Sequence, residues 1–340
     1  MKQGELDFFK GTVLSKNQGD ILICSDMQMD DMAKDLKFSK SWMFGLAMLI
    51  KKGHHLNVIH NLDRPINEMM LGLESWIPIY MTGQVSPYYF KNNKSNIYSH
   101  LNYVSNSYAL YGECIINYHK NGKYYLTNNK NELIYYHQKA EILLNKSMPV
   151  MDIYTTNNKN EFNDFLKNDV VTDGNRTRIL SSLPLHTISK ELLLKILKRN
   201  KINDNDVKLI MNYYEKEKSN IEIITSNNKI IDRITKIDKK DFEKNNMFLD
   251  LSKLFYDNEI RYCYSEYNEH LDLTYKYSKQ NNNYSLLIND KHCFKNIDIC
   301  IKENNYVIIS KRNNPNIHFV IKNDKLRSAI ENFNPPIIER

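Results

Sequence analysis

The sequence predicts an α/β protein of two lobes that are related by internal duplication. Near the N-terminus, short apolar runs typical of strands alternate with helical patterns, and hairpin-like strands and a helix follow them. The same order of strand, helix, strand, hairpin strands and helix returns in shorter form near the C-terminus. We therefore expect a first αβ lobe at residues 1–154, a mainly helical section at 155–250 and a second, shorter αβ lobe at 251–340.

The first lobe is organised around a strand, a crossover helix and a second strand. Residues 21–24 (Ile-Leu-Ile-Cys) and 56–59 (Leu-Asn-Val-Ile) are apolar runs of strand length. Between them, residues 39–52 have a helical pattern that is apolar on most sides, with Ser39 as its N-cap and Gly53 as its C-cap. Because parallel neighbours cannot be joined by a tight turn, this order predicts a parallel pair of strands.

Periodicity and turn residues predict the other elements. In the first lobe we expect a short helix within 1–19, a helix at 66–77 that Pro78 ends, an edge strand at 85–90, hairpin strands at 100–104, 108–117 and 123–126, a helix at 131–144 and a strand at 148–154. In the middle section we expect helices at 160–166, at 190–197 after the N-cap Ser189, and at 206–218. In the second lobe we expect strands at 260–264, 284–288, 297–301, 306–310 and 317–321, and helices at 266–279 and 324–333.

The composition favours a soluble, folded protein of the cytoplasm. The chain has 340 residues, of which 41% are hydrophobic, and this is enough for a sizeable core. The formal charge of +7 comes from lysines scattered among Asn, Asp and Glu, which favours a solvated surface over a nucleic-acid patch. The longest apolar segment, residues 42–50, is less than half a membrane span.

The cysteines argue against a disulfide scaffold or a zinc site. They are odd in number and form no CxxC pair: Cys24, Cys114, Cys263, Cys293 and Cys300. Together with the lack of a signal peptide, this predicts a reducing compartment. We expect no metal and no cofactor.

Polar side chains follow both strands of the predicted parallel pair. Asp26 comes after the first strand, His60 after the second, and Arg64 four residues later. Ligands of open α/β sheets bind outside the carboxyl ends of the strands, so these three residues are candidates for ligand contact. Arg64 offers a planar fork for a carboxylate or phosphate. In the alternative interpretation Asp26 caps a turn, and Arg64 pairs with Asp63 or Glu68.

A broken motif occurs in both halves of the chain. His100, Asn102 and Ser107 stand in the first half, and Phe294 and Asn296 stand in the second. The spacing resembles the site strand of the phospholipase D-like fold, which is itself a duplicated α/β domain. Its catalytic members place His-x-Lys, then Asp five residues after the lysine, on that strand in each half. The resemblance implies a nucleophilic imidazole, a second imidazole as general acid, and lysines that hold the phosphate. Here both lysines are replaced by asparagine, so we expect no phosphodiesterase chemistry.

The replaced positions remain candidates for binding. If the duplication is real, Asn102 and Asn296 face each other, and the amide suits a neutral polar ligand or a hydrogen bond that locks the halves. His60 and His100 would bind a metal only if their rings converged. The only literal His-x-Lys, at 137–139, falls on a predicted helix.

Longer phrases extend over most of the chain: Gly53-His-His-Leu-Asn-Val-Ile-His60-Asn-Leu-Asp-Arg64, Trp76-Ile-Pro-Ile-Tyr-Met-Thr-Gly83 with Pro87-Tyr-Tyr-Phe90, Phe294-Lys-Asn296-Ile-Asp-Ile, and Val307-Ile-Ile-Ser-Lys311. They look like the long C-terminal region of certain bacterial XRE-type helix-turn-helix regulators. The resemblance implies a ligand-sensing or interaction region attached to a DNA-binding domain. No helix-turn-helix precedes Lys2, so we expect DNA to be read only through an attached or separate domain.

We therefore expect a non-catalytic, cytoplasmic sensor region of a bacterial transcriptional regulator. It would bind a small molecule or a regulatory protein between its lobes, form a homodimer, and have no membrane partner. The candidate ligand-binding residues are Asp26, His60, Arg64, His100, Asn102 and Asn296. Two alternatives remain open: a phospholipase D-like phosphodiester hydrolase that uses His100, and a protein-interaction scaffold without a small ligand.

Overall fold

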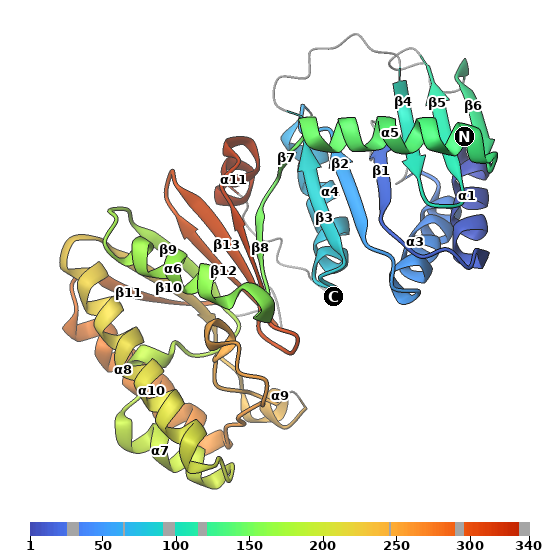
Figure 1. Ribbon diagram of the computed structural model, residues 1–340. Coiled ribbons are helices and arrows are strands. Elements are labelled where there is room, and N and C mark those ends of the chain that lie inside the picture. The colour runs from blue at the N-terminus through green and yellow to red at the C-terminus, as the bar shows by residue number, and fades with distance from the viewer. Residues whose placement is uncertain are drawn as a thin grey trace. The chain divides into compact units, whose positions relative to one another are not determined.

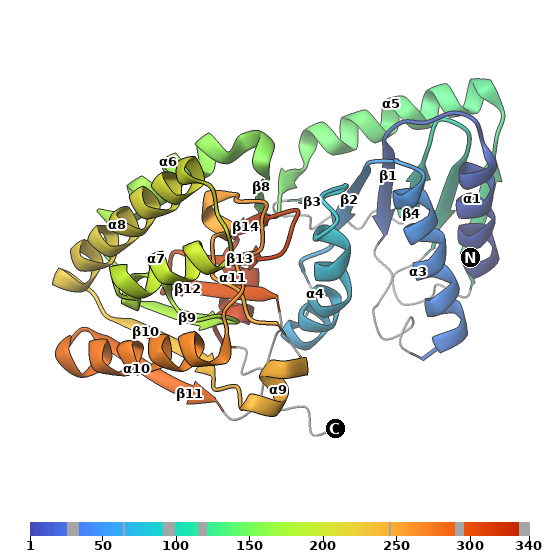
Figure 2. The same cartoon turned by 90° about the horizontal axis from the view of Figure 1, so that it is seen from below.

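The computed structural model describes residues 1–25, 34–63, 65–90, 99–114, 121–244, 246–289 and 296–332. The chain divides into two compact units, Met1–Met151 and Asp152–Arg340. Each unit is built on one seven-stranded mixed sheet that packs against helices (Figures 1 and 2). This is the α/β architecture of two lobes that the sequence predicts.

The sheet of the first unit has the strand order β6-β5-β4-β1-β2-β3-β7. Strands β1, β2 and β3 are parallel to one another, and β4 runs antiparallel to β1 and begins an antiparallel run through β5 to β6. The strand bounds are β1 Ile21–Ser25, β2 Leu56–His60, β3 Val85–Tyr89, β4 Ser99–Val104, β5 Ala109–Glu113, β6 Lys123–Thr127 and β7 Met148–Pro149. The predicted parallel pair and hairpins are confirmed.

The described helices of the first unit cover both faces of this sheet (Figure 1). They are α1 Lys2–Leu14, α3 Leu36–Lys51, α4 Ile66–Tyr80 and α5 Lys130–Lys146. On one face, Phe9 of α1 packs edge-on against Trp42 of α3 and contacts Tyr103 of β4. On the other face, Leu133 and Ala140 anchor α5 in an apolar cluster with strand residues of β1 and β4.

Two helix ends differ from the sequence prediction. Helix α3 begins three residues before the expected Ser39, because the Asp35 carboxylate accepts a hydrogen bond from the Phe38 N–H and caps it. Helix α4 continues past Pro78 to Tyr80, since a proline near the last turn removes only one backbone donor. The expected end of α3 at Gly53 is confirmed, with a φ of 89° that favours glycine.

The sheet of the second unit has the order β11-β10-β9-β12-β13-β14-β8. Here β9, β10 and β11 are parallel, and β12, β13 and β14 form the antiparallel run. The strand bounds are β8 Asp152–Tyr154, β9 Arg176–Leu180, β10 Ile230–Thr235, β11 Tyr284–Asn289, β12 Ile297–Lys302, β13 Tyr306–Lys311 and β14 Ile317–Ile321.

The helices of the second unit include the longest of the described chain. They are α6 Lys159–Val170, α7 Lys190–Arg199, α8 Asp204–Asn227, α9 Lys239–Lys244, α10 Tyr264–Gln280 and α11 Asp324–Glu331, with one-turn 3₁₀ helices at Thr156–Asn158, Leu185–Thr187 and Ser252–Leu254. The main apolar cluster joins α7, α8 and α10 to strand residues such as Ile234. As expected, Ser189 caps α7 by accepting from the Leu192 N–H.

Six strands of each sheet share their order and direction, while the seventh lies at opposite edges, with β7 next to β3 and β8 next to β14. In each sheet the first of three parallel strands lies in the middle, with the other two parallel strands on one side of it and three antiparallel strands on the other. Strands β9, β10, β11, β12, β13 and β14 therefore correspond to β1, β2, β3, β4, β5 and β6. The hydrogen bonds fix the register: Ile21 N–H donates to the His55 carbonyl at 2.9 Å, and Arg176 N–H donates to the Lys229 carbonyl at 2.8 Å. Ile21 therefore corresponds to Arg176. The predicted duplication is present at the level of strand order and direction.

The second copy is longer than the sequence predicted. The expected helical section at 155–250 contains β9 and β10, and both strands lie inside the second sheet. The expected strand at 260–264 is instead a single bridge between Arg261 and Phe248, after which α10 begins. The helices α7 and α8 thus form the crossover between two parallel strands and are not an insertion between lobes.

None of the helices that the structure describes has the length and apolar character needed to cross a membrane.

Candidate functional site

The six candidate residues from the sequence have different positions. Asp26 and Arg64 lie outside the described residues. His60 ends β2, where its Nε2 lies 2.6 Å from the Tyr80 hydroxyl and its ring packs edge-on against Trp76. His100 lies on β4, two residues before Asn102.

Asn296 is not the counterpart of Asn102. It occupies an exposed bend before β12, where its carbonyl accepts a hydrogen bond from the Arg312 N–H. Asn102 pairs with Cys24 of β1, and Cys24 corresponds to Ile179 of β9. Ile179 pairs with Ile299, so Ile299 is the true counterpart. The expected equivalence was wrong by three residues.

Asn102 is the candidate with the most unusual surroundings. The strand register places its side chain between those of Cys24 on β1 and Tyr111 on β5. Only 2% of Asn102 is exposed, and neither its amide nitrogen nor its amide oxygen has a hydrogen-bond partner in the described structure. A buried amide normally has at least one partner, so this group marks a candidate site.

Helix α5 brings a cation to the same place. The Lys139 ammonium lies 4.2 Å from the ring centroid of Tyr111, and Tyr136, three residues earlier on α5, also contacts that ring. Burial lowers the pKa of Lys139, while the charges of Glu113 and Cys24 act in the opposite direction. Cys24 and Tyr111 flank Asn102 in the strand register, and both interact with Lys139, so α5 covers the face of the sheet toward which this row of side chains points.

The chemistry of this group is that of a binding site. The Asn102 amide offers two donors and an acceptor, and Lys139 offers a positive charge. Among the described residues, no cluster of three His, Cys, Asp or Glu side chains has metal-binding geometry. Sequence reasoning selected Asn102 but missed Lys139 and Tyr111. Two patterns could have found them. Side chains alternate between the two faces along β5, and Tyr136 and Lys139 are three residues apart, which places them on one face of α5.

A second polar group lies at the carboxyl end of β9. The Asp298 carboxylate accepts hydrogen bonds from the Ser181 N–H and hydroxyl, both at 2.7 Å, and Arg312 donates to the same hydroxyl at 3.0 Å. Burial, with the nearby Asp250 carboxylate, raises the pKa of Asp298 to about 7. The pKa of Asp250 is lowered instead, because Arg312 and the Ser252 donors outweigh the effect of its burial. This group links three strand ends and is a candidate for pH-dependent stability.

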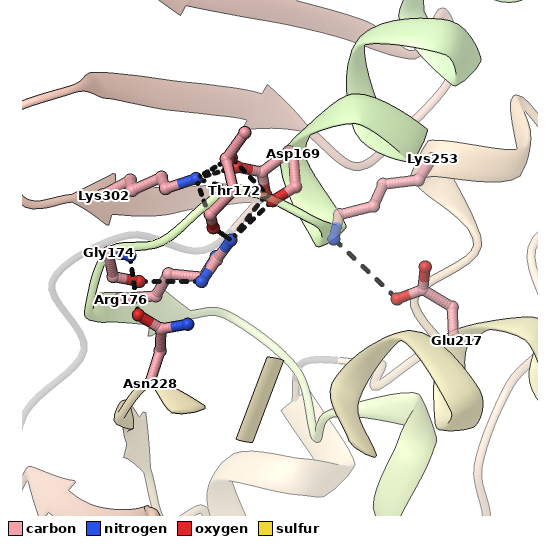
Figure 3. A network of polar contacts seen from close by, with 8 residues as sticks. All are labelled: Asp169, Thr172, Gly174, Arg176, Glu217, Asn228, Lys253 and Lys302. Atoms are coloured by element: carbon pink, nitrogen blue, oxygen red, sulfur yellow. Dashed lines mark hydrogen bonds and ion pairs between the residues drawn. The ribbon is translucent and has the colours of Figure 1, made fainter. Parts of the chain in front are cut away.

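A third polar group, shown in Figure 3, is structural. The Asp169 carboxylate accepts from Lys302 at 2.7 Å and from Arg176 at 3.2 Å, and the Gly174 N–H donates to Asn228. A Cβ at Gly174 would approach the Lys302 side chain within 2.8 Å. The charges of this group are paired, so it fastens the loop after α6 to the sheet. Lys253 and Glu217, also drawn there, form a looser ion pair at 3.9 Å.

Comparison with known proteins gives no family. No protein-family model and no curated protein matches the chain. Among solved structures, the archaeal chromatin protein TrmBL2 is similar over 44% of this chain and 51% of its own, with 10% identity and a TM-score of 0.29. Polyphosphate kinase from Porphyromonas gingivalis is similar over 97% of this chain and 47% of its own, also with 10% identity and a TM-score of 0.29. The chain thus spans about half the length of each, and likenesses of this size define no function.

Proposed function

We propose that this chain is a non-catalytic sensor region that binds a ligand at Asn102 and acts in transcription regulation. The buried, unpartnered amide of Asn102 is the observation that carries the proposal. Leaving such a group without a hydrogen bond costs about 1–3 kcal/mol of stability. Violations of such local rules are expected at functional or strained sites.

The duplicated sheet supports a functional interpretation of Asn102. At the corresponding position of the second sheet stands Ile299, which is buried and apolar. The fold therefore forms with an aliphatic side chain at this place, and the amide is not needed to build it. A ligand that supplies one acceptor and one donor would satisfy both ends of the Asn102 side chain.

The residues at this strand disfavour catalysis. In the phospholipase D-like pattern, Asn102 stands in place of a lysine and Ser107 in place of an aspartate. Ser107 forms hydrogen bonds with Ser15 and Asn17, which follow α1. An asparagine carries no charge to offset a phosphate, and the serine is not an acid that could orient an imidazole.

The wider setting follows the resemblance to bacterial XRE-type regulators. In that setting the chain lies in the cytoplasm and binds a small molecule or a regulatory protein. It then passes a change in conformational population to a helix-turn-helix module. A homodimer belongs to the same proposal, because such modules read paired half-sites as dimers.

A thermal-shift screen of metabolites and nucleotides tests the proposal. We expect at least one compound to raise the melting temperature of the wild type by mass action and to leave Asn102→Leu unchanged. The alternative function, a phosphodiester hydrolase, predicts cleavage of bis(p-nitrophenyl) phosphate that is lost in His100→Ala. Such cleavage, or a panel in which every shift persists in Asn102→Leu, would overturn the proposal.

A further inference from the structure

Lys139 is a half-buried cation without an anionic partner. Among the described residues, no carboxylate lies within ion-pair distance of its ammonium, which rests against the Tyr111 ring at 4.2 Å. Other buried cations of this chain behave differently: Lys302 and Arg178 each contact a carboxylate at 2.7 Å or less. A poorly solvated ammonium without a counter-ion is a place where an anion binds favourably.

The amide of Asn102 adds a second requirement to the same place. Its nitrogen donates, and its oxygen needs a donor from outside the described residues. An occupant that satisfies the whole site therefore carries an anionic acceptor beside a hydrogen-bond donor. Tyr111 and Tyr136 bring aromatic rings to one side, which suits a small organic molecule.

The charges near the site select the type of anion. Among the described residues, Lys139 is the one cation that contacts Tyr111. Glu113 lies close enough to influence the pKa of Lys139. Glu113 also accepts a hydrogen bond from the Tyr111 hydroxyl at 2.6 Å, which holds the carboxylate nearby. The Lys139 ammonium can balance at most one added negative charge, and the nearby Glu113 carboxylate disfavours a second negative charge on the ligand. A carboxylate ligand fits this balance better than a phosphate.

We propose that the Asn102 site takes a small carboxylate that also carries a hydrogen-bond donor, such as a hydroxy acid or an amino acid. Lys139 holds the carboxylate, and the amide of Asn102 contacts both the carboxylate and the donor. This inference rests on the proposed function and deepens it by naming the class of ligand. It also makes α5 the element that a bound ligand would draw toward the sheet.

Four probes of similar size separate the chemical requirements. L-lactate has both the charge and the donor, propionate lacks the donor, lactamide lacks the charge, and inorganic phosphate is a dianion. Each is titrated into the full chain at constant ionic strength, and the melting temperature is recorded. We expect lactate to give the largest rise, of a few degrees at tens of millimolar, with the other three at half of it or less.

Two variants and a control locate the effect. Lys139→Met and Asn102→Leu should each reduce the lactate shift at least threefold. Lys146→Met removes an exposed lysine of the same helix and should leave the shift unchanged. Circular dichroism confirms folding, and saturation-transfer NMR with lactate gives a readout that does not depend on stability.

The outcomes distinguish the carboxylate assignment from the sensor function on which it rests. Equal shifts with lactamide, a larger shift with phosphate, or a lactate shift that persists in Lys139→Met would each overturn the carboxylate assignment. So would the absence of any lactate shift or saturation transfer. If another compound still raised the melting temperature of the wild type but not of Asn102→Leu, the sensor proposal would stand with a different ligand. If none did, both would fall.

Discussion

Asn102 and Ile299 occupy the same position in two copies of one sheet, on strands β4 and β12. One side chain is a buried amide without a partner among the described residues, and the other is a buried aliphatic group. Because the two strands have the same neighbours in order and direction, this position of the sheet accommodates either an amide or an aliphatic side chain.

The second sheet contains a buried ion pair where the first is apolar. Arg178 contacts Asp232 through two hydrogen bonds of 2.6 Å, and Tyr284 donates to the same carboxylate at 2.7 Å. The corresponding residues of the first unit are Ile23, Val58 and Val85. We expect Asp232→Val alone to lower the free energy of unfolding of the second unit by about 3–5 kcal/mol, since it leaves Arg178 uncompensated.

The triple variant Arg178→Met, Asp232→Val, Tyr284→Phe should recover part of that loss, because it leaves no buried charge at these three positions. Urea denaturation followed by circular dichroism compares the two variants. A triple variant no more stable than Asp232→Val would contradict this account of the ion pair.

Lys302 should contribute more to stability than an exposed lysine. It is fully buried and pairs with Asp169, while Lys322 forms an exposed pair with Asp152. We expect Lys302→Met to destabilise the second unit by about 3 kcal/mol, at the lower end for a broken buried pair because Arg176 still contacts Asp169. The control Lys322→Met should change stability by less than about 0.5 kcal/mol. Equal effects in urea denaturation would refute the assignment.

Asp298 should make the second unit less stable as the pH rises. Burial, with the nearby Asp250, raises the pKa of Asp298 from 3.8 to about 7, so the folded state holds this proton more tightly than the unfolded state. The resulting stability is complete below about pH 4 and is lost as the pH rises toward 7.

Asp298→Asn cannot ionise and should therefore gain stability relative to the wild type between pH 5 and pH 8. Urea midpoints at the two pH values measure this, with the exposed Asp164→Asn as control. A difference between Asp298→Asn and wild type that stays constant with pH would rule out the raised pKa.

Two buried histidines should act in the opposite direction. Burial lowers the pKa of His270 from 6.5 to about 3 and that of His318 to about 4. The unfolded state then binds protons that the folded state does not, so stability is lost as the pH falls below 6.5. Each histidine adds at most about 1.4 kcal/mol per pH unit. His270→Gln should show a shallower loss than wild type between pH 6.5 and pH 4.5 in urea denaturation. An identical slope would mean that His270 is accessible to protons in the fold.

Much of the first unit could be predicted from the sequence, because its strands are short apolar runs and its helices have clear ends. The strands β9 and β10 could not, since they carry Arg176, Arg178 and Asp232 in the sheet interior. Charged residues normally predict exposure. These two strands fit into a core only because their charges are paired. Arg178 and its partner Asp232 are 54 residues apart, so no local sequence pattern reveals the pair.

Only part of the candidate site could be predicted, because its residues are also far apart in the sequence. Asn102 could be selected because it belongs to a motif on a single strand. Lys139 lies 37 residues later on α5, and its contact with Tyr111 depends on how that helix packs on the sheet. The false equivalence of Asn296 arose because Phe294-x-Asn296 was matched to His100-x-Asn102 by spacing alone, whereas the strand register places Ile299 opposite Ile179.

The free energy of unfolding of Asn102→Leu, measured by urea denaturation without added ligand, tests the central claim most directly. If the amide serves binding and not folding, the variant is more stable than wild type by about 1 kcal/mol, because a buried unpartnered group has been removed. A variant less stable than wild type by 2 kcal/mol or more would show that Asn102 supports the fold and would contradict the account.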